Sequence, residues 1–134
     1  MRTKKLLAII LVILSITMIS QFTVNAADAS IMWVQTSITI NDFSVSGNEV
    51  CVQGATFGYF GVDSCYVIAV LQKKSGSSWV TQKSWTKTAN TDYVALTEYV
   101  TVPAGSYRLY TYHGVTDNGY TEASTMVSPT RIVY

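Results

Sequence analysis

One histidine and two cysteines are side chains of this chain that could act as a base, a nucleophile or a metal ligand. His113 has the chemistry of a general base. A catalytic triad also needs an ordered nucleophile and a carboxylate, and nothing in the spacing singles these out among the many Ser and Thr residues. We therefore expect His113 to be a structural or surface residue, and we assign no catalytic residue.

Cys51 and Cys65 are the only cysteines. Thiols oxidise outside the cell, so an even pair predicts a disulfide if the chain is exported, as its first 26 residues indicate. The closed loop of about 15 residues corresponds to roughly 3 kcal/mol of stabilisation. The alternative is two buried free thiols. Zinc needs more ligands than two cysteines and one histidine at this spacing, and we expect no metal site and no cofactor.

Arg108, Tyr110 and Tyr112 alternate along one predicted strand and so share one of its faces. Aromatic rings beside a guanidinium can stack on sugar rings or anchor a protein partner. The alternative is that the rings are cross-strand packing partners on a half-solvated sheet. The opposite face of the strand carries Tyr107, Leu109, Thr111 and His113, which we expect to point inward.

Trp79 and Trp85 bracket another predicted strand at even spacing. Both point to one face unless a bulge intervenes. That face is either a platform for glycans or the edge of the core, and the need for large side chains in a sandwich favours the core. The candidate binding surface comprises Arg108, Tyr110, Tyr112 and Trp85.

Short alternating segments separated by turn signals make up the chain from residue 37 onward. Cys65 to Leu71 is apolar on both faces, which is typical of a central strand. Asp117-Asn118-Gly119 is the strongest hairpin signal, and Pro129 predicts a break before a terminal edge strand. About seven strands at this spacing predict an all-β, immunoglobulin-like or fibronectin-III-like sandwich over residues 37–134, in one domain.

The first 26 residues have the composition of a cleavable signal peptide. Arg2, Lys4 and Lys5 precede the apolar run 6–19, and Val24-Asn25-Ala26 fits a cleavage site before Ala27. Cleavage before Ser30 is the second option. An apolar run of about 14 residues is shorter than the roughly 20 that a membrane span needs. We therefore expect a secreted, extracellular product.

Cleavage removes three of the nine basic residues and none of the eight acidic ones, which changes the net charge from +1 to −2. Nucleic-acid binding draws most of its affinity from neutralised phosphates, so a weakly acidic chain without a basic cluster predicts no nucleic-acid partner. No basic amphipathic helix remains to hold the domain on a membrane after cleavage.

Several segments together resemble a known family. They are Gly54-Ala55-Thr56, Leu71 to Lys74, Gly76 to Val80 with Trp85, Ala104 to Leu109, and Asn118-Gly119 with Glu122 and Ser124-Thr125. In this order they resemble a family of small secreted proteins of Gram-positive bacteria (Firmicutes), whose domain has no assigned function. The resemblance implies export and a β-sandwich. It implies no activity, ligand or catalytic residue.

These observations favour a secreted, non-enzymatic β-sandwich that binds a surface protein or a cell-wall glycan. A small secreted effector or antimicrobial protein is the first alternative, and a secreted hydrolase is the second. A glycan binder should show exposed coplanar aromatic rings, whereas a hydrolase should show polar residues converging in a cleft around His113.

Overall fold

The computed structural model describes residues 35–134, and all the regular structure of this part of the chain is β-strand. The predicted signal peptide, residues 1–26, and both proposed cleavage sites lie outside the described residues. Between residues 35 and 134 there is no helix long and apolar enough to cross a membrane.

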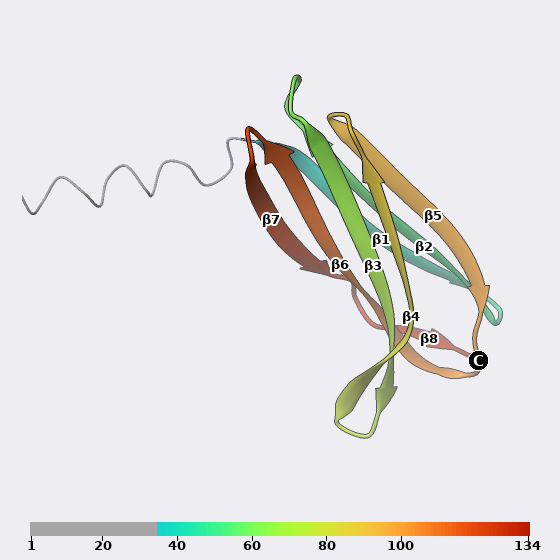
Figure 1. The fold of residues 1–134 in the computed structure, drawn as a ribbon. Helices are drawn as coiled ribbons and strands as arrows, with labels where there is room; N and C mark the ends of the chain where they lie inside the picture. The colour runs from blue at the N-terminus through green and yellow to red at the C-terminus, as the bar shows by residue number, and fades with distance from the viewer. Residues whose placement is uncertain (1–34) are drawn as a thin grey trace, which may run out of the picture. The chain divides into compact units, whose positions relative to one another are not determined.

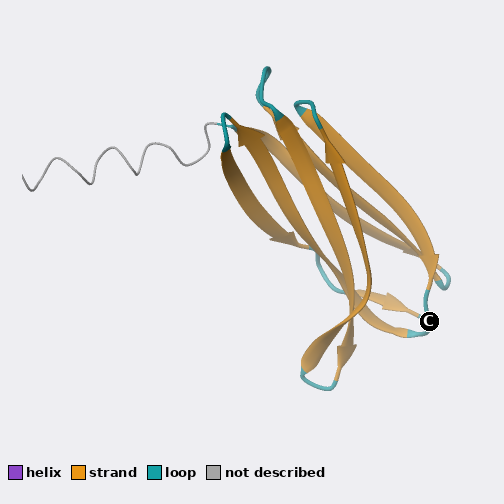
Figure 2. Cartoon of the chain, in the orientation of Figure 1, coloured by secondary structure: helices purple, strands orange, loops and turns teal. Residues whose placement is uncertain are grey.

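Eight strands form two antiparallel sheets that pack as a β-sandwich (Figures 1 and 2). Sheet A has the strand order β1-β2-β5, and sheet B has the order β4-β3-β6-β7, with β8 also paired to β6. The strands are β1 Thr36–Ser46, β2 Glu49–Gly58, β3 Ser64–Ser75, β4 Ser78–Ala89, β5 Tyr93–Thr101, β6 Gly105–Asp117, β7 Tyr120–Val127 and β8 Arg131–Val133. The all-β sandwich that the sequence predicts is confirmed.

The turns form where the backbone needs residues that tolerate a positive φ. Asn118 has φ 50° and Gly119 has φ 77° between β6 and β7. A type I′ turn requires positive φ at both central residues, which Asn-Gly accepts at little cost. The predicted hairpin at this position is confirmed, and its register pairs Asp117 with Tyr120.

The core lies between the sheets and follows the period of two along each strand. In β6, Tyr107, Leu109 and Thr111 are each 0% exposed, and His113 is 1% exposed. Arg108 and Tyr110, on the other face, are only half-buried. The predicted inward set of β6 is therefore confirmed.

The strand β3 is central in sheet B, as its apolar sequence predicts. It pairs with β4 on one side and β6 on the other. Its inward residues Cys65, Val67, Ala69 and Leu71 are 0–1% exposed, whereas the outward residues between them are half-buried. A central strand has a neighbouring strand on each edge, so the side chains on both of its faces lie between those of its neighbours. Apolar side chains are therefore favoured on each face.

Pro129 marks a bulge on the free edge of sheet B. β7 ends its pairing where Tyr110 faces Val127, and β8 resumes where Tyr107 faces Arg131. Three residues of the edge, 128–130, thus face two residues of β6. Proline has no N–H to give to the ladder, so a bulge is where it fits.

The predicted disulfide between Cys51 and Cys65 is wrong, because both cysteines are free. They lie on β2 and β3, which belong to different sheets. Cys51 faces out of sheet A near the start of β2, whereas the Cys65 thiol lies beside the backbone of Gly58 at the end of β2. Seven residues of strand separate these positions, or roughly 23 Å. A disulfide needs Cα atoms within about 7 Å.

Candidate binding face

The outer face of sheet B carries a row of aromatic side chains with one arginine near its end. Arg108, Tyr110 and Tyr112 alternate along β6 and point away from the core, as predicted. On this side of the sheet Gln72 faces Arg108, Val70 faces Tyr110 and Ile68 faces Tyr112 across β3. We call Tyr66, Trp79, Arg108, Tyr110 and Tyr112 the aromatic patch.

Arg108 is held by two neighbours. Its guanidinium carbon lies 4.4 Å from the centre of the Trp79 ring. Its Nε donates a hydrogen bond of 2.8 Å to Oε1 of Gln72. Stacking on an indole and one fixed N–H orient the planar fork, while its other N–H groups make no hydrogen bond within residues 35–134. Such a fork is suited to a carboxylate or a backbone carbonyl.

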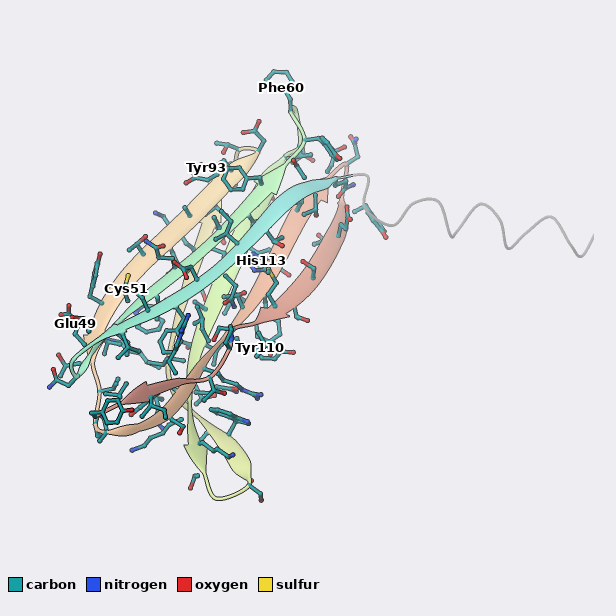
Figure 3. The ribbon with its side chains drawn as sticks, turned by 180° about the vertical axis from the view of Figure 1, so that it is seen from behind. Glu49, Cys51, Phe60, Tyr93, Tyr110 and His113 are labelled. Atoms are coloured by element: carbon teal, nitrogen blue, oxygen red, sulfur yellow. The ribbon has the colours of Figure 1, made fainter. Side chains whose placement is uncertain are left out.

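The two tyrosines of β6 lie against each other. Their ring centroids are 5.0 Å apart and their planes are tilted by 44°. Tyr112 is 41% exposed, and Val127 of β7, which pairs with Tyr110, is 48% exposed. The rings therefore present a ridged apolar surface rather than a single plane. Figure 3 shows Tyr110 at the edge of the sandwich.

Tyr66 belongs to the aromatic patch, although the sequence analysis did not single it out. Tyr66 of β3 pairs with Gly114 of β6, and its ring lies over the glycine at the place where a Cβ would stand. Gly114 is thus the sequence signal for this packing, because any other residue would displace the ring. The pattern was recognisable only with the strand register in hand.

Trp79 and Trp85 lie on opposite faces of β4. The register shifts between Leu71 and Gln72, where β4 carries one extra residue. A bulge of one residue reverses the alternation beyond it. Trp85 packs against the core with Lys83 over its ring at 5.4 Å, whereas Trp79 reaches Arg108. The structure therefore places Trp79, and not Trp85, beside Arg108.

His113 lies inside a buried polar network between the sheets. Nδ1 is 2.9 Å from Oγ1 of Thr56, and Nε2 is 2.8 Å from Oγ1 of Thr111. Thr56 donates to the carbonyl of Tyr66, and Asn41 donates to Thr111. One neutral tautomer satisfies every bond: Nδ1–H donates to Thr56, and Nε2 accepts from Thr111.

Burial lowers the pKa of His113 below its ordinary value of 6.5. The charged ring would have two N–H donors and would lose the bond that Nε2 accepts. With 1% of its surface exposed, the ring does not line a cleft that a substrate could enter. Its observed contacts are those of a structural residue that joins the two sheets.

Among residues 35–134, no three His, Cys, Asp or Glu side chains come close enough to hold a metal ion. The chemistry that the geometry does offer is surface recognition. The aromatic patch combines apolar rings, one oriented cation and a rigid sheet beneath them.

Comparisons with known proteins give no match: no family model, no curated protein and no solved structure is similar to this chain. The resemblance to small secreted proteins of Gram-positive bacteria therefore stays a prediction.

Proposed function

We propose that this protein is an exported, non-enzymatic binding module that recognises a protein partner through the aromatic patch. The observation that carries the proposal is the stacking of Arg108 on Trp79 beside the Tyr110–Tyr112 pair. Trp, Tyr and Arg are the residue types most enriched among the side chains that dominate binding energy at interfaces. A sheet holds them in place before binding, which lowers the entropy cost of association.

A protein partner is favoured over a glycan by the shape of the patch. Extended glycans lie across several rings when those rings share a plane. Tyr110 and Tyr112 are tilted by 44° to each other, so a sugar chain contacting one face-on meets the other obliquely. Ridges of this kind fit the side chains of a complementary protein surface better. The glycan remains the second candidate.

We also infer an immunoglobulin-like sandwich, in its fibronectin-III-like form. Two observations support the inference. The fourth strand pairs with β3 and not with β5. Tyr107 lies near the start of the sixth strand, and its hydroxyl donates a hydrogen bond of 2.7 Å to the carbonyl of Pro103, four residues upstream. That contact has the form of the tyrosine corner of such domains.

The proposal is tested by binding of the fluorescently labelled protein to intact cells of the producing strain. Half the cells are first treated with trypsin and half with periodate, which destroys surface sugars. We expect trypsin to abolish binding and periodate to leave it. Arg108→Ala and Tyr112→Ala should each weaken binding at least about tenfold, equivalent to about 1.4 kcal/mol.

Tyr99→Ala is the matched control, because Tyr99 is 63% exposed on the outer face of sheet A. It should bind as the unmodified protein does. Loss of binding after periodate alone would transfer the function to a glycan. An equal effect of Tyr99→Ala, or cell binding that none of these variants weakens, would contradict the role of the aromatic patch.

A further inference from the structure

The loop between β2 and β3 presents the most exposed phenylalanine of the described chain. Phe60 is 98% exposed, and Figure 3 shows it at the tip of the loop. The loop turns at Tyr59–Val62: the N–H of Val62 donates to the carbonyl of Tyr59 at 3.4 Å, and Gly61 has φ 94°. A glycine with positive φ at the third position is what a type II turn requires. Phe60 therefore occupies the outer corner of a defined turn.

The base of this loop is tied to the body of the domain. Val62 packs against the core. The N–H of Asp63 donates to the carbonyl of Thr116 at 2.9 Å, and Oδ2 of Asp63 accepts from the N–H of Asn118 at 2.8 Å. The exposure of Phe60 is thus imposed by the structure on both sides of it. The adjacent Tyr59 is 53% exposed, so the loop holds two neighbouring apolar side chains in water. A contiguous exposed apolar surface is typical of a contact site.

Acidic residues surround Phe60 at this end of the sandwich. The β4–β5 loop lies alongside, since the N–H of Gly58 donates to the carbonyl of Asp92 at 2.7 Å. All four acidic residues of sheet B and its loops lie here: Asp63, Asp92, Asp117 and Glu122. Glu122 is buried and accepts hydrogen bonds from the N–H groups of Gln35 and Thr36, so the three aspartates supply the surface charge. The three loops 58–64, 89–93 and 116–121 contain no Lys or Arg.

The opposite end of sheet B is basic and hollow. The β3–β4 hairpin projects beyond the rest of the sheet there (Figure 1). A hollow of about 320 Å³ is lined by Lys73, Lys74, Ser75, Val80 and Gln82. Val80 is 47% exposed. Arg108 and Arg131 lie at the same end of sheet B, where they pair with Gln72 and Tyr107, although the guanidinium of Arg108 stacks on Trp79 on the outer face. Pockets of this size, roughly 300 Å³ and above, hold small ligand groups.

We propose that Phe60 of one copy of this protein inserts into the hairpin hollow of a second copy. The ring would contact Val80, and the aspartates around Phe60 would face Lys73 and Lys74. The two surfaces are complementary in charge, and Val80 offers the ring an apolar contact. They lie about 40 Å apart on each copy, at the two ends of a 12-residue strand. A contact between different surfaces is head-to-tail, so repeated copies produce open chains or closed rings.

Charge decides between this occupant and a lipid surface. A loop with an exposed phenylalanine can also insert into a bilayer, but bacterial and cytoplasmic leaflets carry negative charge that attracts basic segments. Asp63, Asp92 and Asp117 would be repelled by such a surface. The basic hairpin hollow is the complementary surface that this chain itself contains.

The test is sedimentation velocity of the purified protein between about 10 µM and 1 mM, with Phe60→Ser, Lys74→Glu and an equimolar mixture of the two variants. The unmodified protein should form dimers and longer species with rising concentration. Each variant alone should associate at least tenfold more weakly. The mixture should form dimers and nothing longer, because Phe60→Ser keeps the hollow and Lys74→Glu keeps the loop. Raising the salt to about 1 M should weaken association, since the Debye length falls to about 3 Å.

Tyr99→Ser is the matched control, because Tyr99 is 63% exposed on the outer face of sheet A, away from the loop and the hollow; it should associate as the unmodified protein does. Phe60 and Lys74 are both exposed, so neither substitution removes core packing. A protein that stays monomeric at 1 mM, a mixture without dimers, or association undiminished in Phe60→Ser would overturn the proposal. So would binding of the monomer to vesicles of phosphatidylglycerol that Phe60→Ser abolishes.

Discussion

The two faces of β6 carry the same kinds of residue under opposite conditions. Tyr107 points inward, is 0% exposed and donates a hydrogen bond of 2.7 Å from its hydroxyl to the carbonyl of Pro103. Tyr112 points outward and is 41% exposed. Residue type is equal, so the surroundings alone separate a tyrosine that stabilises the fold from one that is free to bind. Stability should therefore reside on the inner face and recognition on the outer one.

The largest expected effect comes from truncating one tyrosine on each face. Tyr107→Ala should lower the free energy of unfolding by about 2–4 kcal/mol, because it leaves a cavity between the sheets. Tyr110→Ala and Tyr112→Ala should cost much less, since partly exposed side chains lose little burial. Urea denaturation of the three variants measures the order. An equally damaging Tyr112→Ala would show that the outer face is part of the stabilising core.

The next effect is the pH dependence of the inner face. The pKa of His113 is lowered in the folded state, so the unfolded chain takes up the proton first. Stability is therefore complete above about pH 6.5 and falls as the pH drops toward the folded pKa, by at most about 1.4 kcal/mol per pH unit. Because the chain has one histidine, urea denaturation from pH 7.5 to 5.5 isolates this group.

His113→Gln is the control for that titration. It should be less stable at neutral pH but should show no slope between pH 7.5 and 5.5, above the range of ordinary carboxylates. A persistent slope in this variant would assign the effect to another group. A flat profile in the unmodified protein would mean that His113 is not buried as a neutral ring.

A smaller effect separates the ring of Tyr107 from its hydroxyl. Tyr107→Phe keeps the packing and removes the bond to Pro103, leaving a carbonyl without its partner. We expect a loss of about 1 kcal/mol in the free energy of unfolding. Tyr112→Phe, with an exposed hydroxyl, should change stability by less than about 0.5 kcal/mol. Equal losses for the two variants would remove the tyrosine-corner argument for the fold.

The two cysteines allow the same comparison of an outward and an inward side chain by chemical reactivity instead of stability. Cys51 is half-buried on the outer face of sheet A, whereas Cys65 is buried and burial raises its pKa. A thiol reagent should label Cys51 in the native protein and both residues in urea, because the thiolate is the reactive form. Intact mass follows the labelling. A native protein 2 Da lighter than its reduced form would restore the disulfide.

Much of the fold followed from local patterns. Alternation along Tyr107 to His113 identified the inward set, and Asn118-Gly119 placed a hairpin, because both depend on neighbouring residues alone. Pro129 likewise predicted a break, since a proline cannot donate to a ladder wherever the strand lies. Arg108, Tyr110 and Tyr112 were recognised as one outward group for the same reason.

Contacts between strands far apart in sequence were beyond those patterns. The sequence by itself determined that Cys51 and Cys65 lie on consecutive strands, but which sheet each strand joins depends on pairing with β5 and β6, many residues away. One extra residue in β4 exchanged Trp85 for Trp79 beside Arg108. The presentation of Phe60 opposite a basic hollow depends on the same tertiary arrangement. Periodicity sets the face of a residue within its strand, whereas only packing decides what that face meets.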